Sequence, residues 1–118
     1  MGTAMRFGAQ SEKETGGGLR LIEQGTVQGN GTANLERFSP SGIYLLFLEQ
    51  VASGTLIYQA AWMLSAPPKA RMETADILGS AIGETGSHAP TVTVGIGGIG
   101  ITPYNSASVV QYALYRVR

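Results

Sequence analysis

The chain contains no cysteine, few charged residues and no long apolar run, and each absence excludes a class of protein. Without cysteine it cannot be a small disulfide-stapled scaffold, and its composition fits a protein made in a reducing cytoplasm. Charged residues occupy only 14% of the 118 positions, about half the usual share. So few charges beside many apolar, Gly, Ser and Thr residues indicate extra buried surface, as in contacts between subunits.

Neither nucleic acid nor a membrane is expected as a partner. Eight basic residues balance eight acidic ones, and the basic residues are scattered, so no run could neutralise a row of phosphates. The longest apolar stretches, Ile43 to Leu48 and Ala60 to Leu64, are far shorter than the roughly 20 residues that a membrane helix needs. The N-terminus also lacks the basic segment and apolar core of a signal peptide.

The chain divides into a tether and one domain. Residues 1–18 are polar and glycine-rich, which predicts a flexible N-terminal tether. Residues 19–118 consist of short β-like runs separated by turn residues, at a spacing of about 8–12 residues that is typical of sandwiches and barrels. We therefore predict an all-β domain, an antiparallel, jelly-roll-like β-sandwich of about eight strands. Its last strand is expected from Val109 to Val117.

Turn residues predict where the strands meet. Gly29-Asn30-Gly31 separates two β-like runs, Leu19 to Gln28 and Thr32 to Phe38. Its Asn-Gly pair tolerates the positive φ of a tight turn and so predicts a hairpin. Further turns are predicted at Ser39 to Gly42 and at Ser53-Gly54.

The central and C-terminal runs give further strands. Ile43 to Leu48 is apolar at every position, which predicts a strand covered on both faces. Residues 69–82 fit either a helix or a strand, and we favour the strand because the rest of the domain is β. Gly83 to His88 is predicted to be a loop, and Thr91 to Ile96 and Ile99 to Thr102 are predicted to be strands.

The segment Gly95 to Gly100 matches the glycine pattern of a dinucleotide-binding fingerprint. That fingerprint requires a helix directly after it and an acidic residue about 20 positions later. Here Ile101-Thr102-Pro103 follows, which cannot begin a helix, and no acidic residue follows at all. We interpret the segment as a glycine-rich turn or bulged strand and expect no cofactor.

No catalytic or metal-binding constellation is evident, so we expect no enzyme and no bound metal. His88 is the sole histidine, and it lacks acidic neighbours at a ligand spacing or an orienting acid for a hydrolytic triad. Four carboxylates could in principle pair as in a glycosidase, which needs a separation of about 5 to 9.5 Å. They are Glu49, Glu73, Asp76 and Glu84, and we interpret them as solvated surface charges.

Three loop residues are the candidate ligand contacts: His88, Tyr104 and Asn105. Tyr104 and Asn105 lie in a Pro-Tyr-Asn-Ser turn, where an aromatic ring is expected to be exposed and could stack on a sugar. His88 lies in the predicted loop before Ala89-Pro90. The other large aromatics inside apolar runs, Tyr44, Trp62 and Tyr112, are expected in the core.

Four segments together resemble a known family. They are Ser39 to Leu46, Gly54 to Trp62, Thr91 to Val94, and Val110 to Arg118, and they resemble the C-terminal tip domains of bacteriophage tail fibres and related phage structural proteins. The resemblance extends loosely over residues 35–118. It implies an antiparallel β-sandwich that associates as a homotrimer on the virion, is made in the bacterial cytoplasm, and binds host surface glycans or proteins. It implies no catalytic residues.

Three hypotheses of function follow. The leading one is a trimeric tail-fibre tip or knob that recognises a host-cell receptor through its loops. The second is a capsid, tail or decoration protein that binds only other virion proteins. The third is a fragment of a glycan-degrading depolymerase.

Overall fold

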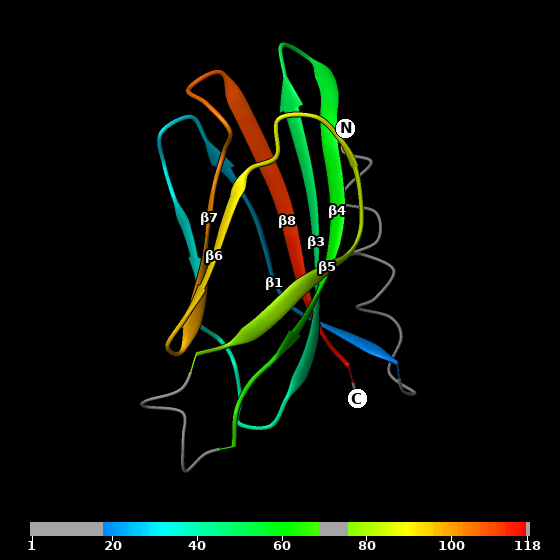
Figure 1. The fold of residues 1–118 in the computed structure, drawn as a ribbon, viewed down its shortest axis with the longest axis vertical. Helices are drawn as coiled ribbons and strands as arrows, with labels where there is room; N and C mark the ends of the chain where they lie inside the picture. The colour runs from blue at the N-terminus through cyan, green and yellow to red at the C-terminus, as the bar shows by residue number, and fades with distance from the viewer. Residues whose placement is uncertain (1–17, 69–75, 118) are drawn as a thin grey trace.

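The computed structural model describes residues 18–68 and 76–117, and these form an antiparallel β-sandwich of eight strands (Figure 1). The predicted all-β fold is therefore confirmed. The larger sheet has the order β1-β8-β3-β4-β5 and the smaller one β2-β7-β6. The strands are β1 (Leu19–Gln28), β2 (Ala33–Leu35), β3 (Ile43–Ala52), β4 (Thr55–Ser65), β5 (Leu78–Gly86), β6 (Thr91–Gly95), β7 (Gly98–Thr102) and β8 (Ser108–Val117).

The core lies between the two sheets and follows from alternation along the strands. In β3, the inward residues Tyr44, Leu46 and Leu48 are buried. The smaller sheet contributes apolar side chains from the opposite side, including Leu35 and Ile101. The expected burial of Tyr44 is confirmed, and two further aromatics, Trp62 and Tyr112, are partly buried against this cluster.

The outward face of the larger sheet is also apolar around β3. Leu45 and Phe47 are half-buried there, and Phe47 packs edge-on against Tyr115 with ring centroids 5.6 Å apart. Ile43 stays 40% exposed and Met63 39% exposed. The expectation that this strand is covered on both faces thus holds fully only on its inward face.

The predicted hairpin around Gly29-Asn30-Gly31 is wrong. A turn does form there, since the Gly31 amide donates to the Gln28 carbonyl at 2.9 Å, but β1 pairs with β8 and β2 pairs with β7. The turn therefore carries the chain from one sheet to the other. Positive φ falls on Gly29, at 55°, and the Gly29 amide donates to the Ser108 carbonyl at 2.9 Å. β2 pairs with β7 of the smaller sheet instead, and β1 remains the edge strand of the larger one.

The turns on either side of β3 are confirmed. The Gly42 amide donates to the Ser39 carbonyl at 3.1 Å. Ser53 and Gly54 both have positive φ, 53° and 79°, which is the geometry that joins β3 to β4 in a two-residue hairpin.

The predicted loop from Gly83 to His88 is wrong in its first part, because β5 continues to Gly86. Glu84 and Thr85 pair with Ala60 and Gln59 of β4, and the main-chain ladder overrides the turn preference of the glycines. The first part of β5, Leu78 to Ile82, supports the favoured strand interpretation of residues 69–82, whose first part, 69–75, lies outside the described residues. The predicted tether, residues 1–18, lies outside them too, apart from Gly18.

Candidate functional site

Two of the three predicted loop residues come together at one end of the sandwich. His88, in the connection from β5 to β6, and Tyr104, between β7 and β8, have ring centroids 4.5 Å apart and an interplanar angle of 47°. Tyr104 is 48% exposed, as expected for an aromatic ring in a turn. The pair offers an exposed aromatic surface formed by two separate loops.

Gln50 holds these two loops in place from inside the domain. Its side chain is fully buried. Its Nε2 donates to the His88 carbonyl at 2.6 Å, and its Oε1 accepts from the Tyr104 amide at 2.7 Å. Sequence reasoning missed this residue. Its signal was a polar side chain at the next inward position of β3 after Tyr44, Leu46 and Leu48.

Asn105, the third predicted residue, shapes the turn that carries Tyr104. Its Oδ1 accepts from the Ala107 amide and from the Ser108 hydroxyl, both at 2.9 Å. This is the turn-stabilising use of an Asn side chain. The acceptor oxygen of Asn105 is thus already bound within its own loop.

Of the four carboxylates considered above, Glu49 and Glu84 are not brought together as a catalytic pair. The Tyr58 hydroxyl donates to Glu84, and burial, then the hydrogen bond and charge of Glu84, raise the pKa of Tyr58 from 10.0 to about 12. Glu49 accepts from Gln59 Nε2 at 3.2 Å. Glu84 pairs in register with Ala60 and Glu49 with Gln59, so the two carboxylates lie on opposite faces of the sheet. Glu73 lies outside the described residues.

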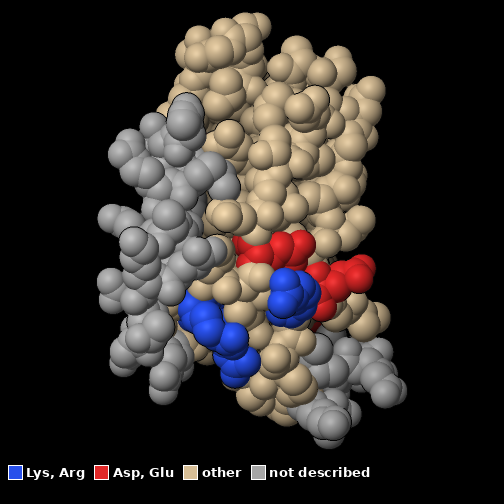
Figure 2. All heavy atoms as spheres, turned by 180° about the vertical axis from the view of Figure 1, so that it is seen from behind, with Lys and Arg blue, Asp and Glu red and all other residues tan. Residues whose placement is uncertain are grey.

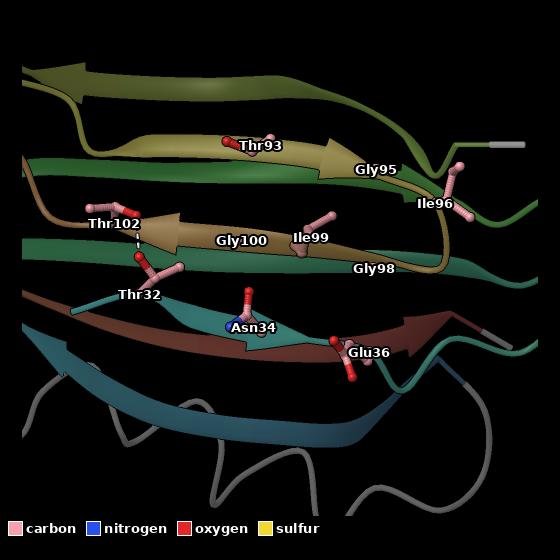
Figure 3. Close-up of a pocket in the computed structure, with 10 residues that line it drawn as sticks. All are labelled: Thr32, Asn34, Glu36, Thr93, Gly95, Ile96, Gly98, Ile99, Gly100 and Thr102. Carbon is pink, nitrogen blue, oxygen red and sulfur yellow. Dashed lines mark hydrogen bonds between the residues drawn. The ribbon is translucent and has the colours of Figure 1, made fainter.

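A polar groove crosses the outward face of the smaller sheet, and no sequence motif indicated it. It is a cavity of about 320 Å³. Its polar side chains include two hydroxyls at one end, where Thr32 and Thr102 are joined by a 2.9 Å hydrogen bond, and the Glu36 carboxylate at the other (Figure 3). The described residues that line it are Thr32, Asn34, Glu36, Thr93, Gly95, Ile96, Gly98, Ile99, Gly100 and Thr102.

Strand alternation and glycine explain this groove. The inward residues of the smaller sheet are apolar, so the alternate positions, which are Thr, Asn, Glu and Gly, face outward. Gly100 pairs with Asn34 on one side and Thr93 on the other, and its missing side chain leaves the face hollow. A Cβ at Gly98 would lie 2.7 Å from the Leu35 carbonyl oxygen, so that position has no room for a side chain.

The glycine pattern from Gly95 to Gly100 therefore has a structural role, as interpreted from its sequence context. It forms the β6–β7 hairpin, with Ile96-Gly97 at the turn and Gly97 at φ 76°. A strand, not a helix, follows it.

The groove can offer hydrogen bonds in both directions. Threonine hydroxyls donate and accept, the Asn34 amide does both, and the Glu36 carboxylate accepts. In the part of the chain that the structure describes, no group of three or more His, Asp or Glu side chains could hold a metal ion. Nor does any described helix have the length and hydropathy to cross a membrane.

Comparisons with known proteins give one structural likeness. No protein family matches the chain, and no curated protein matches it. The tailspike protein of Acinetobacter phage vB_ApiP_P1 is similar in structure with a TM-score of 0.42 and 13% sequence identity over 84% of this chain. The chain spans 21% of that tailspike protein.

Proposed function

We propose that this domain is a non-enzymatic glycan-binding module of a phage or prophage-derived particle, and that the glycan lies in the polar groove. The observation that carries the proposal is the groove itself, in which hydroxyl, amide and carboxylate groups surround a glycine floor. A hydroxyl-rich ligand needs such donors and acceptors at fixed positions. The groove lies on a sheet, so the strands hold these groups rigidly.

The loop pair extends this surface. Tyr104 follows Thr102 by two residues, beyond the end of β7, and the Thr32–Thr102 hydrogen bond marks this end of the groove. An oligosaccharide that fills the groove and continues past Thr102 reaches the Tyr104 ring. Stacking of a sugar on an exposed aromatic face adds contact area that a purely polar groove lacks.

A glycan array with matched glycine variants tests the proposal. A Cβ at Gly100 would contact Asn34 and Thr32 at 3.6 Å, an ordinary separation, so Gly100→Val fills the groove without breaking β7. Gly83→Val is the control, because Gly83 is an exposed strand glycine whose Cβ would meet nothing within 4 Å. We expect Gly100→Val to abolish glycan signals and Gly83→Val to keep them. Equal signals from both variants would contradict the proposal.

The particle and the oligomer form part of the same proposal. The resemblance of residues 35–118 to phage tail-fibre tips and the low charge of the chain support a trimer displayed on a virion. Light scattering coupled to size-exclusion chromatography tests the trimer. A monomer at high protein concentration would refute it.

A second candidate is an assembly protein that binds only other virion proteins. The observation that favours it is β5, which is exposed along its whole length at the edge of the larger sheet. If no glycan on the array binds and virion proteins co-purify with the domain, the assembly-protein candidate is supported. Release of reducing sugar from a host polysaccharide, abolished by Glu73→Gln or Asp76→Asn, would instead indicate a depolymerase.

A further inference from the structure

The three basic residues in the described part of the chain are far apart in the sequence but gather at one place in the fold. Arg20, Arg37 and Arg116 are the only Lys or Arg residues within 18–68 and 76–117, and all three line one cavity of about 390 Å³. Figure 2 shows the basic side chains gathered toward one end of the molecule. The other lining residues are Ile22, Phe38, Ser39 and Tyr44. We call this cavity the arginine pocket.

Strand register creates the arginine pocket. Arg20 of β1 pairs directly with Arg116 of β8, and Arg116 pairs with Tyr44 of β3. Two like charges directly opposite one another destabilise an antiparallel pair. Arg37, in the segment between β2 and β3, adds a third positive charge.

Two of these arginines contact neutral groups. The Arg116 guanidinium lies over the Tyr44 ring, 5.7 Å from its centroid, and Arg37 Nη1 donates to the Ile22 carbonyl at 2.9 Å. Among the described residues, no carboxylate forms an ion pair with any of the three. Acidic side chains lie beside the arginines in Figure 2, but none lines the arginine pocket.

Two acidic residues close in sequence to these arginines, Glu36 and Glu23, interact elsewhere. Glu36 precedes Arg37 in the chain but lines the polar groove instead. The negative charge of Glu23 acts on Tyr112, where burial first and then this charge raise the pKa of the phenol. Within residues 18–68 and 76–117, no acidic side chain lines the cavity to neutralise these three positive charges.

We propose that the arginine pocket binds the oxyanion of a sugar-sized acid, either a carboxylate or a phosphate ester. Guanidinium groups pair with both kinds of oxyanion through two parallel hydrogen bonds. A concave site with one sign of charge concentrates counter-ions, and the cavity of about 390 Å³ falls in the range of about 300–1,000 Å³ typical of small-molecule sites. The Phe38 and Tyr44 side chains supply an apolar wall for the rest of the ligand.

The role of the arginine pocket as a second attachment point for an acidic glycan rests on the proposed function. Its capacity to bind the oxyanion does not, because it shares no lining residue with the polar groove. Failure at one site is therefore distinguishable from failure at the other.

Calorimetric titration of the whole chain with four probes tests this inference: glucuronate, glucose 6-phosphate, inorganic phosphate and glucose. Arg20→Gln removes one guanidinium that makes no hydrogen bond within the described structure. Thr55→Glu is the control, because it changes the net charge equally at an exposed position near the opposite end of β3. We expect glucuronate, glucose 6-phosphate or both to bind, and Arg20→Gln to weaken that binding about tenfold or more.

Comparison of the probes and variants identifies the ligand and separates the arginine pocket from the polar groove. Binding of glucuronate alone assigns the carboxylate, and binding of glucose 6-phosphate alone assigns the phosphate ester. Gly100→Val should leave acid binding unchanged, and Arg20→Gln should leave array signals for neutral glycans unchanged. The inference is overturned if neither acid binds, if only inorganic phosphate binds, or if Thr55→Glu weakens binding as much as Arg20→Gln.

Discussion

The Gln50 side chain joins two loops from inside the domain. It is fully buried and uses both ends of its amide to join the His88 and Tyr104 loops. A buried polar group that loses its partner costs more than the bond itself contributed, because it can no longer bond to water. The exposed aromatic pair thus depends on a residue that no ligand touches.

Replacing Gln50 by leucine should destabilise the domain by roughly 2–4 kcal/mol, because the substitution leaves the His88 carbonyl and the Tyr104 amide without partners. Gln59→Leu is the matched control. It removes a glutamine of the neighbouring strand that is exposed and bonds only to Glu49, and it should change the unfolding free energy by less than about 0.5 kcal/mol. Urea denaturation measures both, and equal losses would show that Gln50 is not a structural clamp.

Tyr58 should make stability fall at alkaline pH. Burial and Glu84 raise the pKa of its phenol to about 12, so the folded protein holds this proton more tightly than the unfolded chain does. The resulting stabilisation is complete below pH 10 and is lost as the pH rises from 10 to about 12. Unfolding free energies across this window should fall less steeply in Tyr58→Phe than in the wild type. Tyr104→Phe, at an exposed ring, should follow the wild type.

At the scale of elements, the backbone geometry at the end of β5 depends on one glycine. Gly86 has φ of 110°, and a Cβ there would clash with the Ile57 carbonyl oxygen. Gly83, three residues earlier in the same strand, has no such constraint. The two glycines therefore differ sharply in what they tolerate.

Gly86→Ala should lower the unfolding free energy by about 2 kcal/mol or more, from strain and the displaced main chain of β4. Gly83→Ala should be neutral or slightly stabilising, because alanine restricts the unfolded chain more than glycine does. Thermal or urea unfolding of the two variants compares them directly. If both variants lose a similar amount of unfolding free energy, the loss comes from replacing a glycine in this strand and not from the positive φ of Gly86.

The elements that local pattern determines were predictable. A continuous apolar run identified β3, whose Tyr44 was expected in the core, and Ser53-Gly54 identified the turn after it. Partner choice was not predictable, since the Asn30 turn is compatible both with a hairpin and with a crossing between sheets. The candidate sites divide in the same way. Tyr104 followed from its turn, but the polar groove and the arginine pocket exist only once register places distant residues on one face.

At the scale of the whole molecule, the edge of the larger sheet at β5 is an exposed surface. All nine residues of this strand are exposed, with Leu78 at 67% and Ile82 at 58%. An exposed edge strand with apolar side chains and few charges is a template for pairing with another chain. In the proposed oligomer, a second copy covers this edge.

Ile82→Lys should shift the oligomer toward the monomer, because a lysine on an edge strand opposes pairing. Leu56→Lys is the control, since Leu56 is 50% exposed but belongs to β4. Light scattering at several protein concentrations measures both variants. If the molar mass of Ile82→Lys is unchanged, the subunit contact does not lie at the β5 edge.

The pairing of β1 with β8 has a mechanical consequence. Leu19 lies opposite Val117 and Gln28 opposite Val109, so both ends of the domain leave from the same corner. Tension applied between those ends opens the ladder one hydrogen bond at a time instead of shearing all of them together. The same proximity allows a short linker to join residues 117 and 19, with new termini cut at the Ser53-Gly54 turn, and such a circular permutant should keep the sandwich.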